Sequence, residues 1–390
     1  MARNKSHIIV GIDIGSYKTK LAIVQHFNNP KIFPKILQIV ETESEGLFHG
    51  NIIDEKEVAE TIWKTIEKLD EDLQKKIRYI VLALGAAGIN SIWSSAFIIN
   101  SNINGEITSL DITRLEEEAE KGLTNFKNRK KIHIIPIKYK IDQNEIQGNP
   151  LHMFGKRLEG KFLFILSPIL YIEKLEEIMK TLNLEIDEIV AGPLAECSLF
   201  LSKKEKMAGT AIINFGHSTT SLLVYENNNP ILLSILPYGS NNITNDIALG
   251  LSVSLEAAEE IKCGRSELPI AKRKLEEIIE FRIADICEKI NLELEKINRR
   301  ELLAGGIILA GGGSELFHSD YLFKYYLKLP IRFANDELIR KTNKQLADTN
   351  FAKAVGLTYF APIISEKYAI KKYCSIFINN VLALLKRLLP

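Results

Sequence analysis

Two short segments of the chain place the same residue types at the same spacing, and those residue types suit phosphate chemistry. Residues 9–24 and 212–225 align at a constant offset, which pairs Asp13 with Asn214, Gly15 with Gly216, and Thr19 with Thr220. Each segment has a β-branched apolar run, a turn of small residues and a second apolar run, which predicts a β-hairpin. Backbone N–H groups in such a turn point outward and can bind phosphate oxygens without a side chain in the way.

The two turns define the first set of candidate binding residues. We predict that phosphates are bound by Gly15, Ser16, Lys18, Asn214, Gly216, Ser218 and Thr219. Asp13 lies on the strand just before the first turn, where its carboxylate is placed to hold a hydrated Mg²⁺ over those phosphates. A single Asp-x-Gly-Ser segment is also common in hairpin turns that bind nothing, so the argument depends on the duplication.

A third segment supplies a glycine-rich loop. Residues 305–310 predict a buried strand, which leads into Gly311, Gly312 and Gly313. Three consecutive glycines let the backbone approach a flat ligand closely, although the same segment alone is compatible with a tight turn that has no ligand. Two matching hairpins that clamp a nucleotide's phosphates, with a glycine loop against the adenosine, form the arrangement of the actin-like ATPases.

With these segments the chain resembles the FtsA family, the bacterial actin homologues that tether the division ring to the membrane. The similarity extends from Ile9 to about Phe360. The segments that carry it are residues 11–18 (GIDIGSYK), 213–220 (INFGHSTT), 237–248 (PYGSNNITNDIA), 258–262 (AEEIK) and 354–357 (AVGL). The combination is specific, whereas each segment alone is not.

The resemblance implies an α/β protein with the actin-like ATPase fold: two lobes with mixed sheets, a small inserted domain of the 1C type and a C-terminal amphipathic helix. It also implies that ATP and Mg²⁺ occupy the cleft between the lobes, with Asp13 contacting the metal through water. Glu259 and Lys262 would contact the ribose, and the three glycines at 311–313 would lie against the adenosine.

The expected domain boundaries follow from the pattern of strands and helices together with the family's organisation. They are residues 1–84, 162–197 and 346–366 for domain 1A, 85–161 for the inserted domain 1C, 198–232 and 302–345 for domain 2A, 233–301 for domain 2B, and 367–390 for a membrane-targeting helix.

One feature of the second hairpin departs from the family pattern. Most members begin this hairpin with Asp-x-Gly-Gly-Gly-Thr, whereas this chain has Asn214 at the acidic position and His217 at a glycine position. Asparagine offers no anion to metal-bound water, and a histidine obstructs close backbone approach. Because hydrolysis requires neutralised charge and an oriented water, we expect ATP to bind while turnover is very slow or absent.

Composition limits the classes of function. A chain of 390 residues exceeds the size at which one core stops growing, which predicts two lobes. The formal net charge of +1 gives no basic field for nucleic acid, and the four cysteines have no metal or redox spacing. The polar start of the sequence and the lack of a long apolar run predict no signal peptide and no membrane-spanning helix.

Residues 275–297 carry apolar side chains at three- and four-residue spacing, which predicts a long amphipathic helix within domain 2B. In the FtsA family this subdomain binds the C-terminal tail of FtsZ. Arg282 has the context Glu-x-Arg, similar to the family's Glu-Pro-Arg, and is therefore a candidate contact for that peptide. The alternative is an arginine on a solvated helix face.

Residues 367–390 contain five lysines or arginines and no acidic residue. As a helix they form an apolar stripe bordered by cations, which is typical of a helix in a membrane interface. The candidate membrane residues are Ile370, Cys374, Phe377, Val381, Leu384, Leu385, Lys386, Arg387 and Leu388. A terminal helix docked on the protein's own core is the alternative.

The resulting hypothesis is an FtsA-like protein that binds ATP, polymerises at the cytoplasmic face of the inner membrane at the division site, and tethers the FtsZ ring. Its expected partners are the FtsZ tail, other FtsA subunits, an anionic membrane and, through domain 1C, other division proteins. Three alternatives remain open. One is a sugar or acetate kinase of the same superfamily, for which no catalytic Asp is found, and another is a scaffold similar to PilM of type IV pilus machines. The third is an FtsA-like chain whose nucleotide site is fully degenerate, as Asn214 would allow.

Overall fold

The computed structural model describes residues 6–27, 32, 34–123, 127–266, 271–334 and 349–360. The predicted membrane helix at 367–390, with all its candidate residues, lies outside these ranges, and so do residues 335–345 of the predicted second part of domain 2A.

The first lobe contains a five-stranded mixed sheet with the order β11-β6-β1-β2-β3. Its strands are β1 (Ser6–Ile14), β2 (Lys18–Phe27), β3 (Lys35–Glu43), β6 (Tyr79–Leu84) and β11 (Glu185–Ala191). The strands β1 and β2 form the first predicted hairpin, and β1 also pairs in parallel with β6. A short ladder of β4 (Leu47–Phe48) and β5 (Asn51–Ile52) follows β3.

The second lobe repeats this arrangement. Its strands are β12 (Thr210–Phe215), β13 (Thr220–Glu226), β14 (Asn229–Leu236), β15 (Ile307–Ala310) and β16 (Ile331–Phe333). They follow the order β16-β15-β12-β13-β14, and β12 pairs antiparallel with β13 and parallel with β15, as β1 does with β2 and β6. The duplication seen in the two hairpins therefore extends to both sheets.

The inserted domain continues the second lobe's sheet. Its strands are β7 (Asn90–Ile99), β8 (Arg129–Ile141), β9 (Asn144–Ile146) and β10 (Arg157–Pro168), and its helix is α3 (Ser109–Lys121). The expected boundary at residue 162, where domain 1A was to resume, is wrong for residues 162–166. These residues form the second half of β10, which pairs with β7 and β8, because one long antiparallel strand continues through the predicted boundary.

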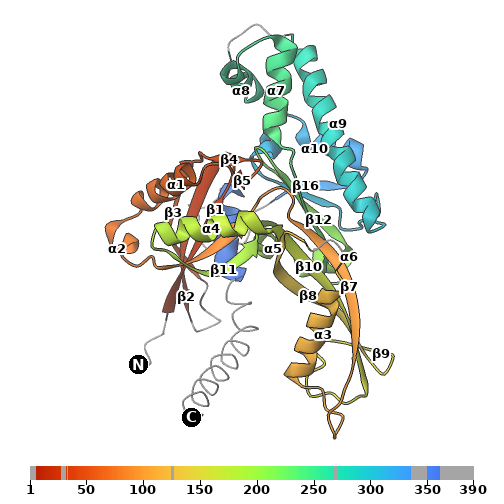
Figure 1. Ribbon diagram of the computed structural model, residues 1–390. Coiled ribbons are helices and arrows are strands. Elements are labelled where there is room, and N and C mark those ends of the chain that lie inside the picture. Colours follow the sequence, from red (N-terminus) through yellow and green to blue (C-terminus); the bar gives the residue numbers. More distant parts are fainter. Residues whose placement is uncertain are drawn as a thin grey trace.

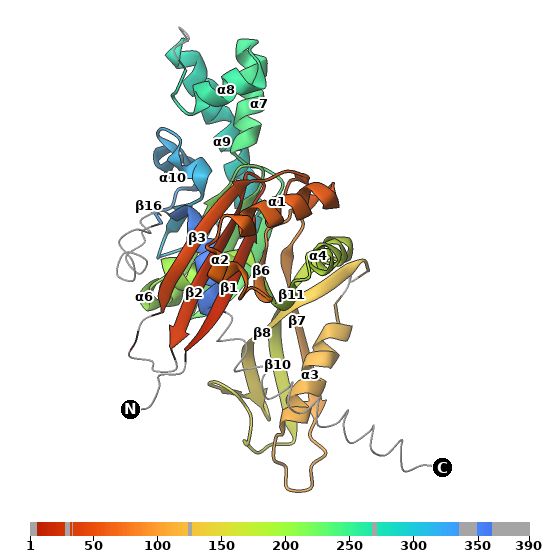
Figure 2. The same cartoon turned by 90° about the vertical axis from the view of Figure 1, so that its left-hand side faces the viewer.

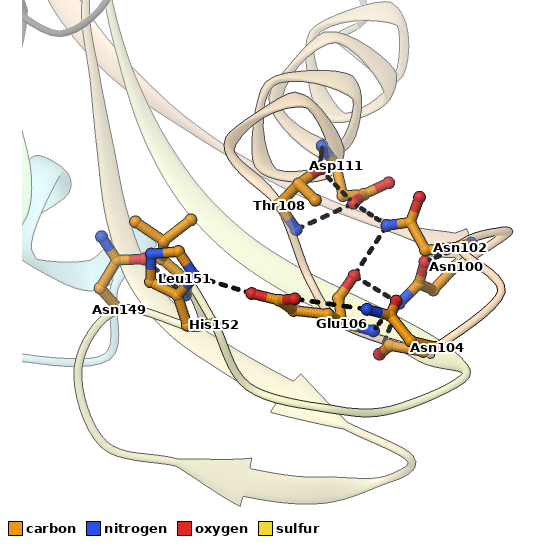
Figure 3. A network of polar contacts seen from close by, with 10 residues as sticks. Asn100, Asn102, Asn104, Glu106, Thr108, Asp111, Asn149, Leu151 and His152 are labelled. Atoms are coloured by element: carbon orange, nitrogen blue, oxygen red, sulfur yellow. Dashed lines mark hydrogen bonds and ion pairs between the residues drawn. The ribbon is translucent and has the colours of Figure 1, made fainter.

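Polar contacts fix the loops at the tip of the inserted domain (Figure 3). The Asp111 carboxylate accepts hydrogen bonds from the Thr108 backbone and the Asn102 side chain, at 2.9 Å each, which caps the start of α3. His152 Nδ1 lies 2.8 Å from Glu106 Oε1 and joins a second loop to this network. The tip therefore has a defined shape, on which Ile103 and Phe154 are exposed.

Helices cover the sheets and form one end of the molecule. They are α1 (Glu55–Glu67), α2 (Glu71–Gln74), α4 (Ile169–Thr181), α5 (Gly192–Phe200), α6 (Lys203–Ala208), α7 (Ser240–Leu251), α8 (Leu255–Lys262), α9 (Lys272–Lys296), α10 (Ser319–Leu327), the 3-10 turns η1 (Gly312–Glu315) and η3 (Thr349–Phe351), and a helix at 352–360. Asp54 caps α1, accepting hydrogen bonds from the Lys56 and Glu57 backbones.

Figure 1 shows α7, α8 and α9 gathered at one end of the molecule and the inserted domain at the opposite end. The turned view agrees, and the first lobe's sheet lies between them (Figure 2). Three apolar clusters correspond to this division: one joins the first lobe to the seam between the lobes, one lies in the second lobe with α7–α10, and one lies under α3.

The helix at 352–360 packs unusually close to its neighbours. A Cβ added at Gly11 of β1 would lie 2.2 Å from the carbonyl oxygen of Ala354, and one added at Gly356 would lie 2.3 Å from that of Ala195 in α5. Only glycine permits backbones to approach so closely. The helix is therefore held between β1 and α5.

Replacing Gly356 with alanine should lower the free energy of unfolding by about 1–3 kcal/mol, because the added methyl group forces the helix away from Ala195. Urea denaturation would measure this loss. Gly85→Ala is the matched control, since an added Cβ there meets nothing within 4 Å. Equal stability of the two variants would contradict the close packing.

Candidate nucleotide-binding site

The two predicted hairpins exist and have the same local geometry. A Cβ added at Gly15 would lie 2.8 Å from the Lys18 carbonyl oxygen, and one added at Gly216 would lie 2.8 Å from that of Thr219. In both turns the glycine is thus required by close contact with the backbone three residues later. This equivalence confirms the alignment made from the sequence.

Both turns open into one cleft of about 1120 Å³, slightly larger than the range of about 300–1,000 Å³ that is usual for ligand pockets. The predicted site residues that line it are Asp13, Gly15, Ser16, Lys18, Asn214, Gly216, Thr219, Glu259, Lys262, Gly311, Gly312 and Gly313. Of the predicted phosphate contacts, Ser218 does not line the cleft. Ser218 is buried, and its carbonyl oxygen lies 2.9 Å from His49 Nδ1.

The tips of the two hairpins touch across the cleft. The rings of Tyr17 and His217 have their centroids 5.2 Å apart, so the histidine that replaces a family glycine contacts the opposite lobe. Burial, reinforced by the positive charge of Lys262, lowers the pKa of His217 and favours the neutral ring.

The ammonium of Lys18 is paired with the carboxylate of Glu41 on β3. Its hydrogen bond to Glu41 raises the pKa of Lys18, although burial opposes that shift. Both residues line the cleft, so Lys18 contributes a fixed positive charge beside the first turn.

The glycine loop is packed against the second hairpin. Gly311 has φ 90°, and a Cβ there would lie 2.5 Å from Asn214 Oδ1 and from the Phe215 carbonyl oxygen. Gly313 is similarly restricted by the Phe215 ring at 2.8 Å. Gly312 differs, because an added Cβ would meet nothing within 4 Å, so its face of the loop borders open cleft.

The two predicted ribose contacts lie together on α8. Lys262 Nζ lies 2.6 Å from Glu259 Oε2, and the Thr244 hydroxyl donates to the same oxygen at 2.6 Å. Burial opposes ionisation of Glu259, but the hydrogen bonds from Lys262 and Thr244 prevail and lower its pKa. The structure thus presents a charged, oriented carboxylate to this part of the cleft.

The sequence did not reveal two charged residues on the cleft floor, Glu196 of α5 and Lys353 of the helix at 352–360. Glu196 is 1% exposed, accepts a hydrogen bond from the Asn214 amide, and has Lys353 Nζ 3.8 Å from its Oε1. A signal was present, because Glu196 interrupts an otherwise apolar helix, but only the fold places it beside the second hairpin.

Burial raises the pKa of Glu196 to about 7. The charge of Lys353 opposes this shift and that of Asp13 adds to it. The pKa of Lys353 is also raised, but for another reason. Burial lowers it, and the negative charges of Asp13 and Glu196 outweigh that effect. The cleft floor therefore holds a compact, nearly balanced group of charges.

These residues suit a nucleotide with a hydrated divalent cation. The turns offer backbone donors, Lys18 and Lys262 offer positive charge, and Gly312 leaves space for a flat group. Within the described part of the chain, no group of three or more His, Cys, Asp or Glu is arranged to hold a metal ion. The Asp13 carboxylate lines the cleft at the end of β1, and a carboxylate beside phosphate-binding turns suits a hydrated divalent cation.

Arg282, the predicted peptide contact, lies on α9 and forms a fork with Asp246 of α7. Its Nε and Nη2 lie 2.6 and 2.8 Å from the two carboxylate oxygens, and Nη1 lies 3.1 Å from Asp285. The guanidinium is thus engaged within the protein, and its role in peptide binding remains a prediction.

Two family models match the chain and together cover more than half of it. The model "Cell division protein FtsA" matches residues 211–356, and the model "SHS2 domain inserted in FTSA" matches residues 87–166. Cell division protein FtsA of Bacillus subtilis is 27% identical over 381 residues, covering 92% of this chain and 84% of that protein. The FtsA of Borreliella burgdorferi is 26% identical over 383 residues, with 92% and 91% covered.

Solved structures confirm the actin-like fold. A PilM–PilN type IV pilus biogenesis complex has a TM-score of 0.64 at 18% identity, covering 90% of this chain and 98% of that chain. MreB5 of Spiroplasma citri bound to ADP has a TM-score of 0.52 at 12% identity, covering 94% and 98%. At these identities the likeness concerns the fold alone.

The raised pKa of Glu196 makes a prediction for stability without nucleotide. Since the folded-state pKa of about 7 exceeds the ordinary glutamate pKa of 4.5, the favourable contribution of protonated Glu196 is complete below about pH 4.5 and is lost as the pH rises through about 7. Glu196→Gln should therefore gain stability relative to the unmodified protein over this range. Urea titrations at several pH values would measure it, and a pH-independent difference would contradict the assignment.

Proposed function

The chain belongs to the FtsA family of cell-division proteins, and from this we propose that it binds Mg²⁺-ATP between its lobes, polymerises on the cytoplasmic face of the inner membrane, and tethers the FtsZ ring at the division site. The observation that supports this best is the pair of equivalent hairpin turns that open into one cleft beside an accessible glycine loop. Family membership favours this function over that of a pilus scaffold or a kinase.

Each lobe contributes its own half of the site. Backbone N–H groups of turns 15–18 and 216–219 bind phosphate oxygens from opposite sides, and Lys18 compensates their charge. Glu259 and Lys262 bind the ribose, while Gly311–Gly313 admit the adenosine. A bound triphosphate accepts hydrogen bonds from both turns at the same time. Its binding therefore favours the arrangement in which the two lobes are closed around it.

Turnover is slow in this proposal. Asn214 presents an amide where most family members have a carboxylate, and this amide already donates to Glu196. His217 is half-buried and packs against Tyr17 at the tip of the second hairpin, where its lowered pKa favours the neutral ring. Neither side chain supplies the negative charge that would orient and activate a water for attack. ATP then acts chiefly as a clamp between the lobes.

Protein partners bind at the two ends of the molecule. The tip of domain 1C holds exposed Ile103 and Phe154 on a hydrogen-bonded frame, which suits contact with another subunit or a division protein (Figure 3). At the other end, α9 and Arg282 form the surface that we assign to the FtsZ tail. An acidic peptide there would share the guanidinium with Asp246.

Membrane attachment is assigned to residues 367–390, on the basis of the sequence alone. Each cation near an anionic leaflet contributes about 1 kcal/mol, so one tail binds reversibly and a filament binds firmly through its many tails. None of the helices in the described ranges combines the length and the apolarity that a membrane span requires.

Gly312→Val should reduce ATP affinity at least tenfold, because the side chain enters the open cleft, while the melting temperature without ligand changes little. Calorimetric titration of Mg²⁺-ATP would measure the affinity. Phosphate release at a rate typical of kinases, or binding that is unaffected by the valine, would contradict the proposal.

Removal of residues 373–390 should abolish sedimentation with anionic vesicles and leave ATP binding intact, since every residue that we assign to the nucleotide site precedes residue 373 in the sequence. The control uses neutral vesicles, to which the full chain should bind weakly. Undiminished binding of the shortened protein to anionic vesicles would refute the assignment of the tail.

A further inference from the structure

Glu196 is a buried carboxylate that the two-hairpin description of the site does not use. It lies on α5, whose other residues are apolar or small, and is 1% exposed. Burial of a charged group is expensive unless it is paired or hydrogen-bonded. The environment of each carboxylate oxygen therefore indicates what the group does.

Among the described residues, one of the two carboxylate oxygens has protein partners and the other has no hydrogen-bond partner. Oε1 accepts the hydrogen bond from the Asn214 amide and lies 3.8 Å from Lys353 Nζ. Oε2 is buried and has no hydrogen-bond partner in the described part of the chain, although Glu196 lines the cleft. A buried oxygen without a donor costs free energy, so a partner from outside the protein is expected.

The pairing with Glu196 also explains the asparagine of the second hairpin. An aspartate at position 214 would bring its carboxylate into contact with that of Glu196, and two like charges at hydrogen-bond distance repel strongly. An amide at that position instead donates to Glu196. The site thus keeps a second acidic residue, but on α5 and not on the hairpin strand.

We propose that Glu196 takes the place of the missing hairpin carboxylate and, together with Asp13, binds the water shell of the divalent cation that accompanies the nucleotide. This inference rests on the proposed binding of Mg²⁺-ATP. Asp13 reaches the cleft from β1 of the first lobe, and Glu196 reaches it from α5 beside β12. Since two carboxylates are too few to enclose the ion, contact through water is the mode that fits.

Without the cation, the positive charge of Lys353 offsets the repulsion between the two carboxylates. Its ammonium lies 3.8 Å from Glu196 Oε1, and the charge of Asp13 contributes to its raised pKa. A purely structural role, in which Glu196 only neutralises Lys353, is the competing explanation. The two roles differ in one measurable property, the dependence of ATP affinity on Mg²⁺.

The experiment compares ATP affinity with Mg²⁺ and with EDTA, by calorimetry on the full chain. In the unmodified protein Mg²⁺ should strengthen binding. In Glu196→Gln this advantage should fall by about 10–100-fold, as for loss of a group in the outer shell of a metal site, while affinity in EDTA is unchanged or greater. Adding Asn214→Asp to Glu196→Gln should restore the advantage.

Glu280→Gln is the matched control, because Glu280 also lines the cleft but lies on α9 and accepts a hydrogen bond from Tyr326. Its Mg²⁺ advantage should equal that of the unmodified protein. An equal advantage in Glu196→Gln would overturn the inference and leave Glu196 as the partner of Lys353.

Two further results are distinguishable. Failure of the unmodified protein to bind ATP in either condition would refute the proposed function itself. If Glu196→Gln does not fold, Asn214→Asp alone decides, because a third carboxylate beside Glu196 should enlarge the Mg²⁺ advantage. An equal or smaller advantage in that variant overturns the inference.

Discussion

The close packing of the helix at 352–360 is the constraint on which the site depends. Its backbone approaches β1 at Gly11 and α5 at Ala195 so closely that no Cβ fits at either contact. Because β1 carries Asp13 and leads into the first turn, and α5 carries Glu196, this packing fixes how the two carboxylates lie relative to each other. Lys353 lies on the same helix and pairs with Glu196, so this one helix fixes both the positions of the two carboxylates and the positive charge that balances them.

Duplication explains why one cleft can hold a ligand from two sides. Both sheets repeat the same strand order, and both turns need a glycine at the same contact. The two copies then differ in chemistry. The first keeps an acidic residue and Lys18, whereas the second carries Asn214 and a histidine that packs on Tyr17. The asymmetry is consistent with firm nucleotide binding and slow turnover.

The balance of buried charge links stability to binding. Without ligand, the cleft floor holds Asp13 and Glu196 against Lys353, and burial keeps Glu196 near its titration point at neutral pH. In the proposed complex, a cation and a triphosphate would change the charge on both sides of this group together. A protein that is closed by its ligand can retain such a costly arrangement, because the free energy of binding offsets the burial.

The sequence by itself determined the hairpins, the glycine loop, the long helix of domain 2B and the family, because these depend on local spacing of apolar residues and on turn chemistry. Residues 162–166 were assigned to the right kind of element but the wrong sheet, since strand pairing is not local. Only the tertiary structure brought Glu196 and Lys353 to Asn214. Their partnership depends on backbone contacts between segments far apart in the chain, for which a single sequence has no periodic signal.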